Sequence, residues 1–446
     1  MQSITYNLNL CDVLKNENNY FNIKKYTYNN NEYTIIKYNK EKLKELEQNA
    51  DMQNYNFLRK YRSVILRNNK VVVFSPEKSI NYEKFINTYE LNQCYVEDFI
   101  DGTMINVFYD NVNEIWEIAT KSTVGGNIIF FNDIKNYQYF NKDYNYSNLT
   151  FRSMFLEACS VNNFKLEYLD KKYCYTFVMQ HPFNRIVTPI VQPLIYLIKV
   201  YEINHNLANC LSVENLYDVT INEINIHELY NSPPYIFLNT NVKFVNKYLT
   251  NTFNINNYEE LKNYYTGINA PYYCVGCMIY SNDGIRTKIR NNNYEMVRKL
   301  RGNQPKLQYN YLCLKQENKV KDFLFYYPEH SVIFNKFKLM TYAYTNELFM
   351  NYISCFIRKE KQLKAYDFQY KNHMYKLHEK YKTELKPNNK IIDKKFVIDY
   401  FNQLHPAQQM FVINYKLSQE TVVNNEVNEV NMEVETSNNE TFIMVN

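Results

Sequence analysis

The chain is poor in glycine and tryptophan, with seven and one of these residues among 446. It is rich in tyrosine and phenylalanine, with 45 and 28 respectively, and asparagine and lysine occur throughout. This bias is typical of the codon usage of an AT-rich genome. The abundance of tyrosine is therefore weak evidence for a surface that stacks on nucleobases.

Long hydrophobic runs are also missing. A transmembrane helix needs about 18 to 20 apolar residues, and the closest stretch, 186–201, is interrupted by Thr, Pro, Gln and Lys. The amino terminus lacks the basic segment and apolar run of a secretory signal. The nine cysteines are odd in number and unevenly spaced, which is not the pattern of a disulfide framework. We therefore expect no membrane segment and a reduced compartment, the cytoplasm.

The length of the chain predicts more than one domain, because a single hydrophobic core rarely serves so many residues. Signals for strands dominate residues 55–305, and signals for helices dominate 306–416. Residues 1–54 are polar with few strong signals and are predicted to be an N-terminal extension. The tail, 417–446, has glutamate but no lysine or arginine, which predicts acidic disorder. The net charge of +5 permits contact with a polyanion without requiring it.

The pattern of the chain is organised around residues 96–126. They predict a strand, a tight turn at Asp101-Gly102-Thr103, a second apolar strand, and a third strand that enters a Gly-Gly turn. Glycine suits the reversal because it tolerates positive φ angles. Taken alone, this segment is interpreted as a β-hairpin.

Further strands are predicted on both sides of this segment. Residues 61–66 and 70–74 form a predicted hairpin around an Arg-Asn-Asn turn, and 173–179 form a buried strand that resumes at 186–191. In 285–290, Lys288 and Arg290 are two residues apart, so their side chains share one face of a strand.

Four elements together carry a resemblance to a known family. They are the Asp-Gly-Thr turn, Arg62 on an earlier strand, the stretch His181-Pro-Phe-Asn-Arg-Ile-Val187, and Lys288-Ile-Arg290. The set resembles the RNA-ligase branch of the covalent nucleotidyltransferases, in particular RNA ligases of the bacteriophage type. The 181–187 stretch is the most specific part of the match.

The resemblance implies an α+β fold, with an antiparallel-sheet nucleotidyltransferase (ATP-grasp-like) domain at 55–305 and an all-helical domain at 306–416. It also implies ATP and Mg²⁺ as cofactors, and a nucleotide or phosphate as ligand. The residues that match the family's nucleotide-binding positions are Arg62, Asp101, Gly102, Lys121, Phe177, Gln180, Asn184, Arg185, Lys288 and Arg290.

The sequence departs from the family at its catalytic positions. The family's nucleophilic lysine stands two residues before Asp-Gly, where this chain has Phe99, and a benzyl group has no lone pair to attack phosphorus. Gln180 and Val275 stand where the family has carboxylates, so groups that would hold a divalent metal are missing. We therefore predict no catalytic residue and no metal ligand. A zinc site at Cys274 and Cys277 is the weaker alternative to a core role for this pair.

The leading hypothesis is a degenerate RNA ligase, a pseudoenzyme that binds nucleotides or the ends of RNA or another nucleic acid. The basic runs 358–364 and 376–382 are interpreted as solvated helix faces, with an RNA-binding surface as the alternative. One rival is an active ligase or nucleotidyltransferase that uses Lys121 or Lys78 as its nucleophile. Another is a structural or assembly protein, because the combination resembles ligase-like proteins of large nucleocytoplasmic DNA viruses. A viral protein would act in the cytoplasm of the infected host cell.

Overall fold

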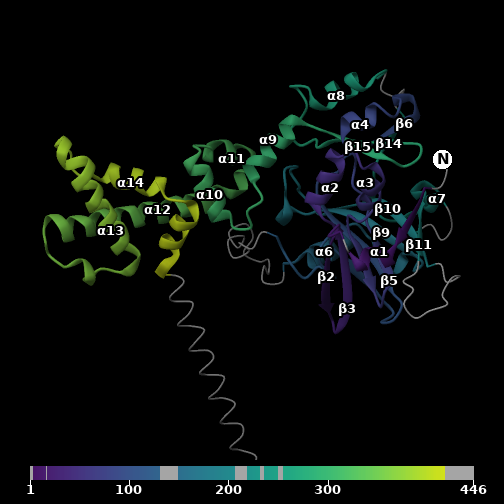
Figure 1. Ribbon diagram of the computed structural model, residues 1–446, viewed down its shortest axis with the longest axis horizontal. Coiled ribbons are helices and arrows are strands. Elements are labelled where there is room, and N and C mark those ends of the chain that lie inside the picture. The colour runs from purple at the N-terminus through teal and green to yellow at the C-terminus, as the bar shows by residue number, and fades with distance from the viewer. Residues whose placement is uncertain are drawn as a thin grey trace, which may run out of the picture. The chain divides into compact units, whose positions relative to one another are not determined.

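The computed structural model describes residues 4–16, 18–130, 149–205, 218–231, 236–249 and 255–416. The chain divides between Arg301 and Gly302 into two compact units, whose elements are labelled in Figure 1. The N-terminal unit contains three β-sheets, and the described residues of the C-terminal unit form helices and connections. The predicted combination of antiparallel sheets and a helical C-terminal region is confirmed at this coarse level.

The largest sheet has the strand order β1-β11-β10-β9-β7-β8, and β12 also pairs with β10, in parallel. Its strands are β1 (Thr5–Asn9), β7 (Thr103–Asp110), β8 (Ile115–Ala119), β9 (Tyr173–Gln180), β10 (Leu194–His205), β11 (Asp218–Ile224) and β12 (Lys243–Phe244). The helix α6 (Phe151–Val161) begins with a capping box at Thr150 and packs on this sheet, where Phe155 lies 5.7 Å from Phe177 between ring centroids.

A second sheet has the order β13-β6-β14-β15. Its strands are β6 (Cys94–Asp98), β13 (Lys247–Leu249), β14 (Gly276–Ser281) and β15 (Arg286–Arg290). The helices α4 (Tyr82–Ile86) and α8 (Tyr258–Thr266) cover one face, where Phe85 and Leu261 pack against Val96 and Ile279. Since side chains alternate along a strand, the opposite face carries Tyr95, Met278 and Tyr280.

The third sheet has the order β2-β3-β4-β5 and carries the predicted hairpin. Its strands are β2 (Phe21–Tyr28), β3 (Asn31–Tyr38), β4 (Val64–Arg67) and β5 (Lys70–Phe74). Asn68 and Asn69 join β4 to β5 with φ angles of 48° and 61°, as a turn with two left-handed residues requires. The helices that belong to the same part of the chain are α1 (Leu10–Lys15), α2 (Lys40–Gln48) and α3 (Met52–Arg59).

Residues before 55 differ from the expected N-terminal extension, because they belong to the core of the N-terminal unit. The strand β1 pairs with β11, and β3 pairs with β4. Leu8, Leu10 and Leu43 are buried in one cluster with residues of the third sheet and of β10 and β11 in the largest sheet. Pattern reasoning missed this because the partner of β1 lies more than 200 residues further along the chain.

The predicted hairpin at Asp101-Gly102 is wrong. The strand β6 before it belongs to the second sheet and β7 after it to the largest sheet, so residues 99–102 cross between two sheets. Gly102 has a φ of 144°, and a Cβ there would collide with the carbonyl oxygen of Met179. The sequence therefore predicts correctly that this position needs glycine. The reason is the close approach of the crossing segment to the backbone of Met179, and not a two-residue turn.

The predicted strand at 186–191 is wrong as well. Its backbone N–H groups at Val187 and Thr188 donate to the carboxylate of Asp101, at 3.1 and 2.9 Å, and so cannot enter a strand ladder there. A 3₁₀ turn, Pro182–Asn184, precedes this segment. The Asn-rich region that follows β10 contributes the short helix α7 (Ile226–Asn231) in addition to its strands.

The C-terminal unit follows the helix α9 (Asn292–Arg301) and is drawn in green to yellow in Figure 1. Its helices are α10 (Leu307–Gln316), α11 (Val320–Tyr326), α12 (Ser331–Tyr352), α13 (Phe368–Lys380) and α14 (Lys394–Gln403), and residues 406–416 are also helical. Leu348, Met374 and Phe401 belong to its core. Within the described ranges, no helix combines the length and the hydropathy that a membrane crossing needs. The predicted acidic tail lies outside the described residues.

Gly276→Ala should destabilise the N-terminal unit by about 3 kcal/mol. Gly276 has a φ of 123°, and a Cβ there would collide with the carbonyl oxygen of Ile289. Chemical denaturation can be followed by the fluorescence of Trp116, the single tryptophan, which lies on β8.

The matched control is Gly284→Ala in the turn between β14 and β15. Gly284 has a φ of 85°, but its Cβ would meet only side-chain atoms of Ile4. This variant should cost about 1 kcal/mol. Equal costs for the two variants would contradict the assignment of a backbone collision at Gly276.

Candidate functional site

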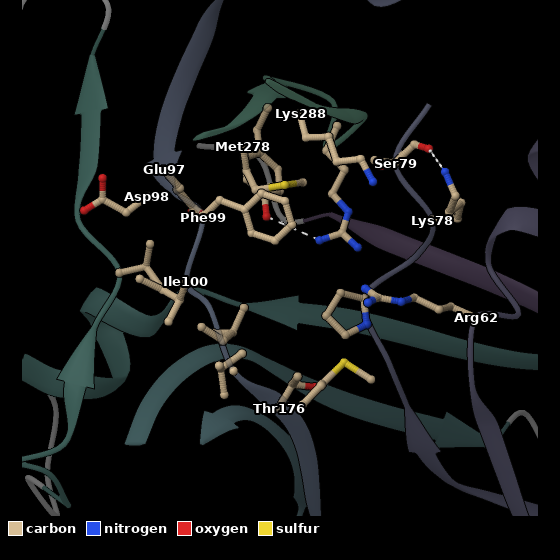
Figure 2. Close-up of a pocket in the computed structure, with 18 of the residues that line it drawn as sticks. Arg62, Lys78, Ser79, Glu97, Asp98, Phe99, Ile100, Thr176, Met278 and Lys288 are labelled. Carbon is tan, nitrogen blue, oxygen red and sulfur yellow. Dashed lines mark hydrogen bonds between the residues drawn. The ribbon is translucent and has the colours of Figure 1, made fainter. Parts of the chain in front are cut away.

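A cleft of about 530 Å³ lies in the N-terminal unit, between the largest sheet and the second sheet (Figure 2). One wall consists of side chains from β7, β9 and β10, among them Met104, Val178 and Ile198. The facing wall consists of side chains from β6, β14 and β15. Residues 99–102, which cross between the sheets, close one end.

The register of the second sheet determines what this wall presents. Met278 pairs with Glu97 on one side and with Lys288 on the other, so these three side chains form a row across the face. The next row along the strands contains Tyr280 and Arg286. Alternation along each strand then places all of them on the side of the cleft.

Phe99 and Arg290 meet because Gly276 lies between them. The N–H of Phe99 donates to the carbonyl of Gly276 at 3.2 Å, and Gly276 pairs with Arg290 on β15. Gly276 has no side chain, so the guanidinium of Arg290 lies over the ring of Phe99, 5.1 Å from its centroid. Figure 2 shows Phe99 in the cleft with Met278 beside it. This contact is a cation–π interaction.

The charge of the lining is strongly positive. Two carboxylates line the cleft, Glu97 and Asp98. The lining cations are Lys40, Arg62, Lys78, Lys121, Arg286, Lys288 and Arg290.

Some of these cations already have protein partners. Arg286 donates to the hydroxyl of Tyr280 and to the carbonyl of Glu77, and Arg290 forms an ion pair with Glu295. In contrast, within the described part of the chain, Arg62, Lys121 and Lys288 have no carboxylate at ion-pair distance. Their charges are therefore available to an anion in the cleft.

The cations that line the cleft also lower one another's pKa values. Burial lowers the pKa of Lys121 to about 8, and Arg62 is the strongest of the neighbouring charges that lower it further. Burial likewise lowers the pKa of Lys288 to about 8, followed by the charges of Arg290, Lys78 and Arg62. Burial, and then the charge of Arg286, lower the pKa of Arg62 to about 10. Such mutual repulsion is costly, and a bound anion would relieve it.

Half of the residues predicted from the sequence lie in this cleft. They are Arg62, Gly102, Lys121, Lys288 and Arg290. Arg62 and Lys121 come from segments of the chain that follow α3 and β8, and Lys288 and Arg290 come from β15. Arg62, Lys121, Lys288 and Arg290 therefore line one hollow together with Phe99.

The other predicted residues lie outside the cleft lining. Phe177 points away from the cleft because its neighbours on β9, Thr176 and Val178, face it. Its ring packs against Phe155 and Phe164 in the core, each at 5.7 Å. Phe177 therefore supports the sheet from the far side.

The buried residues Asp101, Gln180 and Asn184, with the half-buried Arg185, form a support behind the crossing segment. The carboxylate of Asp101 accepts from Val187 N, Thr188 N and the hydroxyl of Tyr294. Gln180 donates to the carbonyl of Asp101 at 2.8 Å, and Asn184 donates to the hydroxyl of Thr103 at 2.7 Å. The guanidinium of Arg185 donates to the carbonyl of Val187. These contacts hold the backbone of 99–103 in place and leave the four side chains no direct share of the cleft surface.

Sequence reasoning missed two cations of the lining, Arg286 and Lys40. Arg286 precedes Lys288 by two residues, so the alternation that linked Lys288 to Arg290 also predicts it. Lys40 carried no such signal, because its position depends on the pairing of β2 with β3. Within the described residues, no group of three or more His, Cys, Asp or Glu side chains is placed to hold a metal ion.

Comparison with known proteins gives no family and a distant structural likeness. The sequence matches no family model and no curated protein. Among solved structures, one that is similar is a protein of Aquifex aeolicus to which the activity of an ATP-dependent DNA ligase has been ascribed. The two share 13% identity with a TM-score of 0.35, over 84% of this chain and 80% of the other. What the cleft binds is therefore inferred from its own residues.

Asp101→Asn should destabilise the N-terminal unit by about 3 kcal/mol, because a buried amide group would face N–H donors that now meet a carboxylate. The measurement is chemical denaturation followed by Trp116 fluorescence. The control is Asp98→Asn. Burial raises the pKa of Asp98, and its hydrogen bonds to Asn246 and Tyr248 are long, at 3.4 and 3.5 Å.

The control variant should therefore cost less than about 1 kcal/mol. If Asp101→Asn keeps full stability but loses the affinity for a nucleotide, Asp101 contacts the ligand directly and the support role is wrong.

Proposed function

We propose that this chain is an RNA-ligase-like binding protein whose cleft holds the phosphate of a nucleotide or of a nucleic-acid end without forming a covalent bond to it. The observation that carries the proposal is the convergence of Arg62, Lys121 and Lys288, which have no carboxylate partners in the described residues, around Phe99. The finer identity of the ligand, RNA or another nucleic acid, is part of the proposal.

Three cations without counter-charges are the kind of site that a phosphate fills. Partly buried positive charges that repel one another raise the free energy of the folded protein. A phosphate of charge −2 attracts all three cations and offsets that repulsion. The guanidinium of Arg62 can bind two phosphate oxygens in parallel, which fixes the orientation of the group. The lysines at 121 and 288 supply charge from other sides of the cleft.

The opposite wall suits the remainder of a nucleotide. Met104, Val178 and Ile198 present apolar surface to the cleft, and Ile100 and Val245 extend it. A flat nucleobase or a ribose can lie on such a surface while the phosphate remains at the cations. The volume of about 530 Å³ lies within the range of small-molecule sites.

The residues present fit ATP or another nucleotide but not a metal ion held by the protein. Glu97, the carboxylate on the cleft face of β6, is buried beside Lys247, at 3.8 Å between Oε1 and Nζ. Gln180 and Val275 occupy the positions where carboxylates were expected, and Gln180 is engaged with Asp101. No step of the proposed function is therefore assigned to Mg²⁺.

One alternative has an observation in its favour. Lys121 lines the cleft, and its pKa of about 8 leaves part of its amine neutral near pH 7.5. A neutral amine can attack a phosphoanhydride, which makes Lys121 the candidate nucleophile of an active nucleotidyltransferase. In that reaction the amine would form a bond to the α-phosphorus of ATP, pyrophosphate would leave, and the ammonium proton would pass to solvent.

Labelling separates the two functions. The protein, incubated with α-labelled ATP and Mg²⁺ or Mn²⁺ and then denatured, should retain no label, because Phe99 supplies no nucleophile. Label that survives denaturation and disappears in Lys121→Ala would establish the alternative and overturn the proposal. Lys299→Ala, an exposed position on α9, serves as the control for loss of one lysine.

The affinity for AMP should fall as the pH rises from 7 to 9. Lys121 and Lys288, with pKa values of about 8, lose their charge in this interval, whereas an ordinary lysine keeps it until about pH 10. The phosphate of AMP stays dianionic throughout, because its second pKa is about 6. Isothermal titration at several pH values measures the profile, and Lys121→Met with Lys288→Met should flatten it.

The matched test at pH 7 compares two double variants. Lys121→Ala with Lys288→Ala should lower the affinity about a hundredfold, as expected for two charge-assisted contacts. Lys299→Ala with Lys306→Ala removes the same charge from exposed positions and should change it little. Equal losses would show that the cleft is not the binding site.

A further inference from the structure

A second hollow opens beside the main cleft. It has a volume of about 470 Å³ and shares four lining residues with the cleft, Tyr38, Lys40, Arg62 and Lys121. The second hollow extends from these shared residues to Lys37 at the end of β3 and to Ser122. The two spaces are therefore adjacent, and Arg62 and Lys121 belong to both.

The second hollow has its own cation. The ammonium of Lys37 donates to the hydroxyl of Ser122 at 3.1 Å, and within the described ranges it has no carboxylate at ion-pair distance. Burial lowers the pKa of Lys37, and the charges of Lys24 and Lys40 lower it further. Glu41, the single carboxylate among the described residues that line this hollow, has an exposed side chain at the start of α2.

One phosphate in the main cleft would leave this second set of charges unsatisfied. A phosphate that contacts Arg62, Lys121 and Lys288 would not reach Lys37, because Lys37 is not among the residues that line the main cleft. Lys37 and Lys40 would remain close to each other and to Lys121. An anion in the second hollow removes that repulsion, and the shared residues require it to be adjacent to the first.

We propose that the second hollow binds a second phosphate group, covalently linked to the phosphate in the main cleft, with Lys37 as its specific contact. This inference rests on the proposed function. The linked phosphate is either the next group of a polyphosphate or the next phosphodiester of a strand. Both have the same charge chemistry, so the ligands in the test distinguish between them.

The test measures the affinities of AMP, of ADP, and of the 5′-phosphorylated dinucleotide pApA, by isothermal titration at one salt concentration. The wild-type protein should bind ADP or pApA at least about tenfold more tightly than AMP, as one charge-assisted contact predicts. Lys37→Met keeps the side-chain stem and should remove this advantage while leaving the affinity for AMP unchanged. A gain with ADP identifies a polyphosphate, and a gain with pApA identifies a strand.

The control is Lys25→Met on the neighbouring strand β2, an exposed lysine outside both hollows. It removes the same charge and should preserve the advantage of the two-phosphate ligands. Lys37→Gln provides a second variant if Lys37→Met unfolds, and Trp116 fluorescence reports the fold of both.

The outcomes are distinct for the two proposals. If AMP binds but ADP and pApA bind no more tightly, the second hollow is not a phosphate site, and the proposed function stands. The same conclusion follows if Lys37→Met lowers the affinities for the three ligands no more than Lys25→Met does. If AMP, ADP and pApA all fail to bind, the proposed function itself is overturned.

Discussion

The hydrogen bonds of the Asp101 carboxylate are the interaction on which the cleft depends. This buried group accepts from two backbone N–H groups at 187 and 188 and from the hydroxyl of Tyr294. It thereby ties the segment between the two sheets to the loop after β9 and to α9. The anchor joins the two walls of the cleft, because β6 and β7 on either side of it belong to different sheets. Because residues 99–102 cross between two sheets and do not form a turn within one sheet, this segment connects the two walls of the cleft.

Lys121 and Lys288 are held in place by the sheets rather than by counter-ions. Lys288 is fixed by the register of β15 with β14, and Lys121 by the end of β8. Ion pairs with carboxylates would have lowered the free-energy cost of burying these cations. They would also have cancelled the positive potential of the cleft. The depressed pKa values of Lys121 and Lys288 are the consequence of this arrangement. A site of this kind is preorganised for an anion and loses little free energy to rearrangement when one binds.

Phe99 is an aromatic residue among the charged side chains that line the cleft. Its ring packs against Met278 and the stacked pair Tyr95 and Tyr280, whose centroids are 5.1 Å apart. The guanidinium of Arg290 covers the ring. The apolar ring thus contributes packing and a cation–π contact at a place where a lysine would have added one more positive charge to a crowded set.

The sequence by itself determined the local elements and which residues lie on the same face of a strand. The hairpin of β4 and β5, the buried strand β9 and the common face of Lys288 and Arg290 all depend on alternation and turn residues, which are local properties. Only the tertiary structure decided that β1 pairs with β11, that Asp101-Gly102 crosses between sheets, and that Lys37 opens onto a second hollow. These facts depend on contacts between segments far apart in the chain, and local patterns carry no information about which distant partner a strand will find.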